Sequence, residues 1–416
     1  MVDVYQRTTC RMCESLRLEK VLALTPTPPG NNFLSEAELD FPESAYPLRL
    51  FFCRDCHHIQ LGHVVDPKIL YQKDYFYVSG TSSKFVEHLN DYALETIKYL
   101  RLKSDSLVVD IGSNDGTCLK AFQQAGINKI LGIDPATKIA QRATESGIKT
   151  IADFFSHDLA KELLKKFGPA KLITSHNACA HIDHLDDVFR GVQYWLDDDG
   201  VFVLEVGYLL DVYENAWFDT IYHEHLDYHT VAPFKKLFER VGMELISVQR
   251  ISPQGGSIRV MAQKVSGPRV VNESVQEMIA LEESKGLYKP ETYIKFSQRI
   301  NEVGIQLRAL IKSIKAKGQT IAAFGAPTKS TTLLAHFGLG KEDLEFIVDD
   351  NPLKHGLFSP AAHIPVFAPE ELYIRHPDYL LILAWNFADQ IMANNQRYLL
   401  EGGKFIVPMP IPRIID

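Results

Sequence analysis

The sequence predicts an α/β protein with three domains: an N-terminal zinc ribbon-like domain, a central Rossmann-like domain and a second, C-terminal Rossmann-like domain. Two C-x2-C cysteine pairs near the N-terminus predict the ribbon. Two successive sets of short apolar strands that alternate with helices predict the Rossmann-like domains. A chain of 416 residues exceeds one ordinary domain. From these signals we expect the three domains to span residues 1–70, 71–285 and 286–416.

The composition is that of a globular protein without a basic surface. Hydrophobic residues make up 46% of the chain, charged residues make up 23%, and the net charge is −8. A pI near 6.0 and the lack of lysine and arginine runs argue against nucleic acid as a partner. We find no signal peptide and no apolar stretch of about 18 residues, so we expect a cytoplasmic protein without a membrane span. Because no coiled-coil pattern is present, we expect a monomer.

The first element along the chain is the pair of C-x2-C motifs, formed by Cys10, Cys13, Cys53 and Cys56. Each spacing lets a tight turn aim two sulfurs at one ion, and two such turns complete a tetrahedral zinc site. Four thiolates leave no open coordination position, which favours a structural role. Unliganded thiols are the alternative, and three histidines are reserve ligands: His57, His58 and His63.

The next element is a predicted helix at residues 85–100, followed by a buried strand that runs from Leu107 into a glycine turn. Gly112 and Gly116 bracket this turn and let the backbone approach a ligand with its amides exposed. Asp134 follows 22 residues after Gly112, at the tip of the second strand, where a carboxylate accepts hydrogen bonds from ribose hydroxyls. We therefore predict a nucleoside cofactor here; an acidic strand end that only caps a helix is the alternative.

The glycine turn also indicates which cofactor binds. A dinucleotide fold carries G-x-G-x-x-G, but the residues after Gly112 are Ser113, Asn114 and Asp115. Acidic side chains beside the turn disfavour phosphate and suit a cofactor with an amino group and a sulfonium. This pattern favours S-adenosylmethionine over NAD, and it leaves a nicotinamide-dependent sugar oxidoreductase as the alternative function.

A helix over residues 293–317 precedes the second alternating set of strands. VVDIGSNDG matches IAAFGAPTK, ILGIDP matches FIVDDNP, and LITSHN matches LILAWN, each about 205 to 215 residues apart. The turn at Phe324–Lys329 has one glycine and a rigid proline, so we expect this domain to cover a substrate rather than hold a second cofactor. Lys329 is a candidate phosphate contact.

The motif YHEHLDYHT, residues 222–230, leaves three interpretations open: a metal site, a catalytic base with its helpers, or a surface turn. His225 and His229 stand four apart, as zinc-protease ligands do, but Leu226 replaces the glutamate of H-E-x-x-H. Its local spacing does not choose among the three.

Taken together, these motifs resemble the zinc-containing sugar C-methyltransferases. The resemblance rests on the two C-x2-C pairs, FFCRDCHHIQLGHV, the run at residues 75–82, VVDIGSNDG, LITSHNACAHIDHL, FVLEVGY, YHEHLDYHT, GGSIRV and FGAPTKSTTLL. It covers almost the whole chain and implies a substrate domain with zinc, a class I methyltransferase domain and a last domain without its own cofactor. It also implies methyl transfer from S-adenosylmethionine to C3 of a nucleotide-linked 4-keto-deoxysugar.

The resemblance assigns the site residues. His225 is implied as the base that removes the C3 proton, a role that suits a neutral imidazole with an ordinary pKa of ~6.5. The other expected catalytic residues are Glu224, Tyr222, His181 and Tyr77, although His181 is equally suited to capping a helix. The expected cofactor-binding residues are Tyr75, Ser79, Gly80, Asp110, Gly112, Asn114, Gly116, Asp134, Pro135, Asp153, Phe154 and Asn177.

Overall fold

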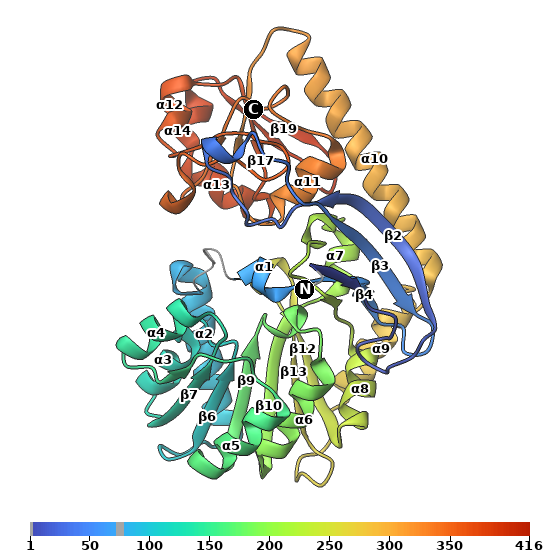
Figure 1. The fold of residues 1–416 in the computed structure, drawn as a ribbon, viewed down its shortest axis with the longest axis vertical. Helices are drawn as coiled ribbons and strands as arrows, with labels where there is room; N and C mark the ends of the chain where they lie inside the picture. The colour runs from blue at the N-terminus through green and yellow to red at the C-terminus, as the bar shows by residue number, and fades with distance from the viewer. Residues whose placement is uncertain (1–2, 72–78) are drawn as a thin grey trace.

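The computed structural model describes residues 3–71 and 79–416. Two lobes built of helices and strands stand one above the other in Figure 1. Along one side they are joined by the long helix α10 (Pro290–Lys315) and by the strands β2 (Leu18–Thr27) and β3 (Tyr46–Cys53). The N-terminal part of the chain therefore connects the two lobes instead of forming an end of the molecule.

The N-terminal sheet has the strand order β11-β4-β3-β2. Strands β2, β3 and β4 (Ile59–Leu61) follow one another along the chain and pair antiparallel in the sheet. Strand β11 (Asp227–Tyr228), which pairs with β4, comes instead from the YHEHLDYHT segment in the middle of the chain. A second ribbon pairs β1 (Val4–Gln6) with β5 (His63–Val65). Buried apolar residues of β2 to β4 share one core with α10 and α11 (Ser330–Phe337), so burial of apolar surface fixes this sheet against the C-terminal domain.

The central sheet has seven strands in the order β12-β13-β10-β9-β6-β7-β8. Only β13 runs antiparallel to its neighbours. The chain order reverses between β6 and β9, which makes their carboxyl ends a topological switch point where ligands bind. The strand bounds are β6 (Leu107–Ile111), β7 (Lys129–Ile133), β8 (Thr150–Ile151), β9 (Ala170–His176), β10 (Leu196–Gly207), β12 (Met243–Ile251) and β13 (Ser257–Lys264).

Helices cover both faces of the central sheet, as expected for a doubly wound fold. One core contains α2 (Ser83–Leu100) and α3 (Thr117–Gln124), and the other contains α5 (His157–Phe167), α6 (Leu185–Trp195) and α8 (Val231–Arg240). Helix α4 (Thr137–Glu145) follows β7, and α9 (Ser274–Ser284) packs against β12. The expected helices at residues 85–100 and 293–317 are confirmed as α2 and α10.

The C-terminal sheet repeats this pattern with the order β16-β15-β14-β17-β18-β19, in which only β19 is antiparallel. Each sheet thus places its first strand between its second and fourth strands, so the prediction of two Rossmann-like domains is confirmed. The strands are β14 (Ile321–Phe324), β15 (Ile347–Val348), β16 (Val366–Phe367), β17 (Tyr379–Ile382), β18 (Lys404–Val407) and β19 (Arg413–Ile415), and the later helices are α12 (Glu371–Arg375), α13 (Ala388–Asn394) and α14 (Gln396–Leu400). Among the described helices, none has both the length and the apolar character needed to cross a membrane.

Candidate active site

The four predicted zinc ligands lie together. The sulfurs of Cys10, Cys13, Cys53 and Cys56 all lie within 4.8 Å of one another, and the Cys10–Cys56 and Cys13–Cys53 pairs are 3.5 Å apart. Zinc–sulfur bonds of about 2.3 Å in a tetrahedron require sulfurs about 3.8 Å apart, so the cluster fits this ion. Both knuckles have the same turn, in which the residue after the second cysteine adopts a positive φ.

Two of the three reserve histidines have other partners. His57 stacks on Tyr288 with ring centroids 5.0 Å apart, and His58 Nε2 lies 2.6 Å from a carboxylate oxygen of Asp227. His229, the other zinc-protease-like position, is fully buried and stacks on Phe234 at 4.5 Å. The YHEHLDYHT motif is therefore an ordered segment that adds a strand to the N-terminal sheet, and the surface-turn interpretation is wrong.

The predicted cofactor loop connects β6 to α3. Gly112 and Gly116 both have φ near +80°, and a Cβ on Gly112 would lie 2.4 Å from the Cβ of Ala178. Asp134 accepts one amide hydrogen bond from Asn114 and one from Ala136, each 2.8 Å long. These bonds fix the carboxylate at the switch point and leave each of its oxygens a further lone pair. This backbone cradle with a fixed carboxylate fits an adenosyl group.

Two more predicted cofactor residues, Ser79 and Gly80, contact this loop from the segment before α2. The amide of Ser79 donates to Asn114 Oδ1 (3.0 Å), and the amide of Gly80 donates to Asp115 Oδ2 (3.1 Å). Asn177, at the carboxyl end of β9, has a positive φ and donates its amide to the Glu205 carbonyl. Three of the expected residues are exposed near the ends of β7 and β8, outside this hydrogen-bonded group: Pro135, Asp153 and Phe154. Two others, Tyr75 and Tyr77, fall outside the described residues.

A buried charged group lies next to the cofactor loop. Asp110 is buried, which raises the pKa of its carboxyl, and it lies 3.9 Å from His176 Nδ1. Glu205 accepts hydrogen bonds of 2.6 Å from His88 and from Arg259 Nε. Burial opposes ionisation of Glu205, but His88 and the nearby positive groups lower its pKa to about 2. Four residues of this group have no motif in the sequence: His176, Glu205, His88 and Arg259. The position of the first two near strand ends is the one signal that could indicate them.

The predicted catalytic residues form a second group. The His225 Nδ1–H donates to the Thr220 carbonyl at 2.9 Å, and the Tyr222 hydroxyl donates to His225 Nε2 at 2.8 Å. The ring of His181 meets that of His225 edge-on, with centroids 5.0 Å apart. Burial lowers the pKa of His225 to about 4 and that of His181 to about 3. Both imidazoles are therefore neutral at pH 7, and His225 has a basic nitrogen, Nε2, in contact with a phenol.

Glu224 is held by residues from the other two domains. Asn31 Nδ2 donates to Glu224 Oε1 at 2.8 Å, and Thr328 Oγ1 donates to Asn31 Oδ1 at 2.7 Å. Burial raises the pKa of Glu224 to about 7. Nothing in the local sequence around Asn31 or Thr328 indicated this hydrogen-bonded chain.

Lys329, from the first turn of the C-terminal domain, faces the central domain. Its ammonium donates to Asn386 Oδ1 at 2.6 Å and lies 3.9 Å from the centroid of the Trp385 ring. Burial lowers the pKa of Lys329 to about 8, although Asp219 opposes this shift. The Trp385 indole in turn donates to the buried Asp219 carboxylate at 2.7 Å.

The C-terminal domain keeps the acidic residue of the cofactor site but surrounds it differently. Asp349 accepts the amides of Ala326 and Asn351, just as Asp134 accepts those of Asn114 and Ala136. Here, however, the ammonium of Lys354 lies 3.8 Å from Asp349 and donates to the Ala326 carbonyl at 2.8 Å.

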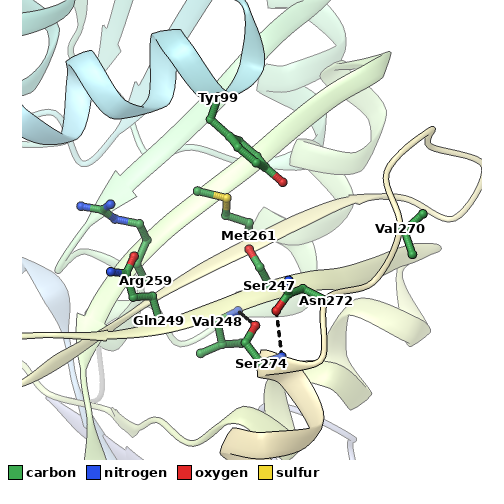
Figure 2. Close-up of a pocket in the computed structure, with 9 residues that line it drawn as sticks. All are labelled: Tyr99, Ser247, Val248, Gln249, Arg259, Met261, Val270, Asn272 and Ser274. Carbon is green, nitrogen blue, oxygen red and sulfur yellow. Dashed lines mark hydrogen bonds between the residues drawn. The ribbon is translucent and has the colours of Figure 1, made fainter.

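A separate hollow of about 320 Å³ lies over β12 and β13 (Figure 2). Tyr99 extends toward it from α2, and Met261 and Arg259 line it from β13. Arg259 is its link to the buried charged group, through Glu205. Since the lining includes neither His181 nor any residue of YHEHLDYHT, we assign this hollow no part in catalysis.

Comparison with known families identifies the domains in order. A zinc binding domain matches residues 10–71, a methyltransferase domain matches residues 85–248, and a C-methyltransferase C-terminal domain matches residues 252–410. With the glycine turn and the four-cysteine cluster, these matches define an S-adenosylmethionine-dependent methyltransferase that has a zinc-binding domain. The nicotinamide-dependent alternative is therefore wrong.

A curated relative narrows the class. The C-methyltransferase NovU of Streptomyces niveus is 36% identical over 407 residues, which are 98% of this chain and 96% of NovU. The chain therefore belongs to the C-methyltransferase family, and the resemblance seen in its motifs is confirmed at this level.

Solved structures that resemble the chain include other methyltransferases. Magnesium protoporphyrin IX methyltransferase from Synechocystis PCC 6803 with bound S-adenosylmethionine is 14% identical, with a TM-score of 0.33, over 44% of this chain and 81% of that one. An S-adenosylmethionine-dependent methyltransferase from Clostridium acetobutylicum is 13% identical, with a TM-score of 0.35, over 44% of this chain and 92% of that one.

Proposed function

We propose that the enzyme methylates C3 of a nucleotide-linked 4-keto-deoxysugar, with His225 as general base and an enolate as intermediate. The observation that supports this most directly is the tautomer of His225. Because the Thr220 carbonyl can only accept, the ring proton lies on Nδ1, and Nε2 keeps the lone pair that takes a proton.

The proton and electron balance assigns a role to each neighbour. The carbon acid gives its proton to His225 Nε2, and the electron pair of the C–H bond moves onto the C4 oxygen. The Tyr222 hydroxyl, which leaves Nε2 as that nitrogen is protonated, donates to this oxygen; one such donor contributes ~3 to 4 kcal/mol. S-Adenosylmethionine, when bound, supplies an electrophilic methyl group to the enolate carbon. As the carbonyl re-forms, the new C–C bond would replace the S–CH3 bond of the cofactor, and S-adenosylhomocysteine would be the leaving group.

The other residues bind and orient the substrate. We assign the binding of a sugar hydroxyl to Glu224, because Asn31 binds its Oε1 and, among the described residues, no donor binds its Oε2. We assign a contact with the nucleotide diphosphate to Lys329, whose ammonium is bound by an amide oxygen and an aromatic face. In this scheme residues 1–70 bind zinc and substrate, residues 71–285 carry out the transfer, and residues 286–416 cover the substrate.

The test is product analysis. The purified enzyme is incubated with S-adenosylmethionine and a panel of nucleotide-linked 4-keto sugars that differ at C3, and the products are examined by mass spectrometry and NMR. We expect a new methyl group on C3 for at least one substrate. A methyl group on another carbon or on oxygen, or no transfer to any 4-keto sugar, would contradict the proposal.

A further inference from the structure

The two zinc knuckles have an arginine at the same position but place it in different surroundings. Arg11 follows Cys10 and is 1% exposed, whereas Arg54 follows Cys53 and lies at the surface in an ion pair with Glu19. Since both knuckles form the same turn, zinc binding does not require a buried arginine. The burial of Arg11 must therefore serve something beyond the metal.

The contacts of Arg11 lead to the catalytic histidines. Its Nε donates to Asp183 Oδ1 at 2.8 Å, and its NH1 donates to the carbonyls of Leu61 (2.9 Å) and Leu226 (3.2 Å). Asp183 is two residues after His181, and Leu226 directly follows His225. One guanidinium thus holds the two loops whose imidazole rings lie 5.0 Å apart.

Arg11 lies in a buried group of charged side chains whose main effect is on geometry and not on folding energy. Asp227 Oδ2 lies 3.9 Å from Arg11 Nε, and Asp183 is also bound by Arg7 and by the Tyr5 hydroxyl. Burial acts to raise the pKa of Asp183, but Arg11 and its neighbours hold it below its ordinary value. Removing such charges from water offsets most of the attraction between them, so their net contribution to the folding energy is small. We therefore assign these contacts a role in fixing geometry.

We propose that Arg11 is a positioning residue that couples the zinc knuckle to the His181–His225 pair. The knuckle fixes the backbone of Arg11, and its planar guanidinium fixes the loops on either side of the reacting centre. The proposal rests on the proposed role of His225 in proton transfer. It gives the zinc site a part in catalysis although the metal lies outside the reaction.

Arg11→Lys tests this proposal with Arg54→Lys as the matched control. Lysine keeps the charge but cannot donate to both loops at once. We expect Arg11→Lys to keep one zinc per chain, its folded state at the assay temperature and its affinity for S-adenosylmethionine, with a lower melting temperature because buried acceptors lose their donor. We expect kcat to fall about 30- to 100-fold with little change in KM. Arg54→Lys should match the wild type in every measurement. Equal turnover of the two variants would overturn the proposal, as would a loss of zinc or of folded protein that accounts for the lower kcat.

Asp183→Asn approaches the same contact from the other side and leaves the knuckle unchanged. We expect a similar fall in kcat, and the double variant should lose no more than either single variant because the two residues act as a unit. Additive losses would contradict the coupling.

Imidazole nitrogen NMR separates the two proposals. If Arg11→Lys shifts the His181 and His225 resonances while His225→Asn keeps its turnover, the proposed role of His225 fails. The catalytic part of the Arg11 proposal then fails with it, although Arg11 still positions the two rings. If Arg11→Lys leaves both resonances unchanged, the positioning role fails.

Discussion

The Nδ1–H of His225 donates a 2.9 Å hydrogen bond to the carbonyl oxygen of Thr220, and this contact decides which nitrogen can act as a base. With the proton fixed on Nδ1, Nε2 is the acceptor and meets the Tyr222 hydroxyl at 2.8 Å. A histidine in the other tautomer would present an N–H to the same phenol and could not take a proton there.

The first prediction concerns the charge of His225. Burial lowers its pKa to about 4, so we expect a neutral ring protonated on Nδ1 from pH 8 down to about pH 5.5. Imidazole nitrogen chemical shifts measured across this range test it, with the exposed His184 as an internal reference. A His225 ring that carries two protons at pH 6 would contradict the account.

The second prediction concerns Tyr222. Tyr222→Phe removes the hydroxyl that meets the basic nitrogen and the developing oxyanion, so we expect kcat to fall about 10²- to 10³-fold. Binding of S-adenosylmethionine, measured by calorimetry, should not change. Tyr194→Phe, at a half-exposed ring on α6, is the control and should have normal turnover. Wild-type kcat in Tyr222→Phe would remove the hydroxyl from the reaction.

The third prediction concerns stability and pH. Burial raises the pKa of Glu224 to about 7, so in the folded protein the carboxylate form is disfavoured. Ionisation of Glu224 therefore lowers the free energy of unfolding. This loss is absent below the unfolded pKa of about 4.3, grows as the pH rises, and is complete above about pH 7. We expect Glu224→Gln to gain up to about 3 kcal/mol relative to the wild type between pH 4.5 and pH 7.5.

Urea unfolding at several pH values measures this gain. Comparing the two proteins at each pH removes any constant cost of the substitution, such as a weaker bond to Asn31. Glu273→Gln, at an exposed carboxylate, is the control and should show no such trend. A stability difference that stays constant with pH would show that Glu224 is ionised as easily in the folded chain as in the unfolded one.

The fourth prediction uses the repeat between the two Rossmann-like domains. Asp134 and Asp349 each accept two backbone amides at equivalent strand ends, but only Asp134 lies in the cofactor domain. Asp134→Asn should weaken S-adenosylmethionine binding about 10- to 100-fold, the range for losing hydrogen bonds to a charged group. Asp349→Asn should leave the dissociation constant unchanged. Equal effects of the two substitutions would contradict the placement of the cofactor.

Part of this site could be predicted from the sequence because its signals are local. The spacing of Cys10 and Cys13 defines a knuckle, and the distance from Gly112 to Asp134 places a carboxylate at a strand end. The tertiary partners could not be predicted in this way. Asn31 reaches Glu224 across 193 positions of the sequence, and such contacts leave no periodic or spacing signal in one chain.

The same limit applies to the N-terminal sheet. The sequence predicts a ribbon from its cysteines, but the strand β11 that completes the sheet comes from the YHEHLDYHT motif. Two residues are too few for a strand pattern, and only their pairing with β4, Asp227 with Gln60 and Tyr228 with Ile59, reveals the strand. The pairing of the N-terminal sheet with the YHEHLDYHT segment is therefore visible only in three dimensions.

The most direct test of the central claim is exchange of the C3 hydrogen in heavy water without methyl transfer. The enzyme is incubated with a nucleotide-linked 4-keto-deoxysugar and S-adenosylhomocysteine in D2O, and deuterium at C3 is measured by NMR. We predict exchange with the wild type and a loss of at least about 100-fold with His225→Asn, which should still bind S-adenosylmethionine. Exchange by His225→Asn at the wild-type rate would show that another group removes the proton.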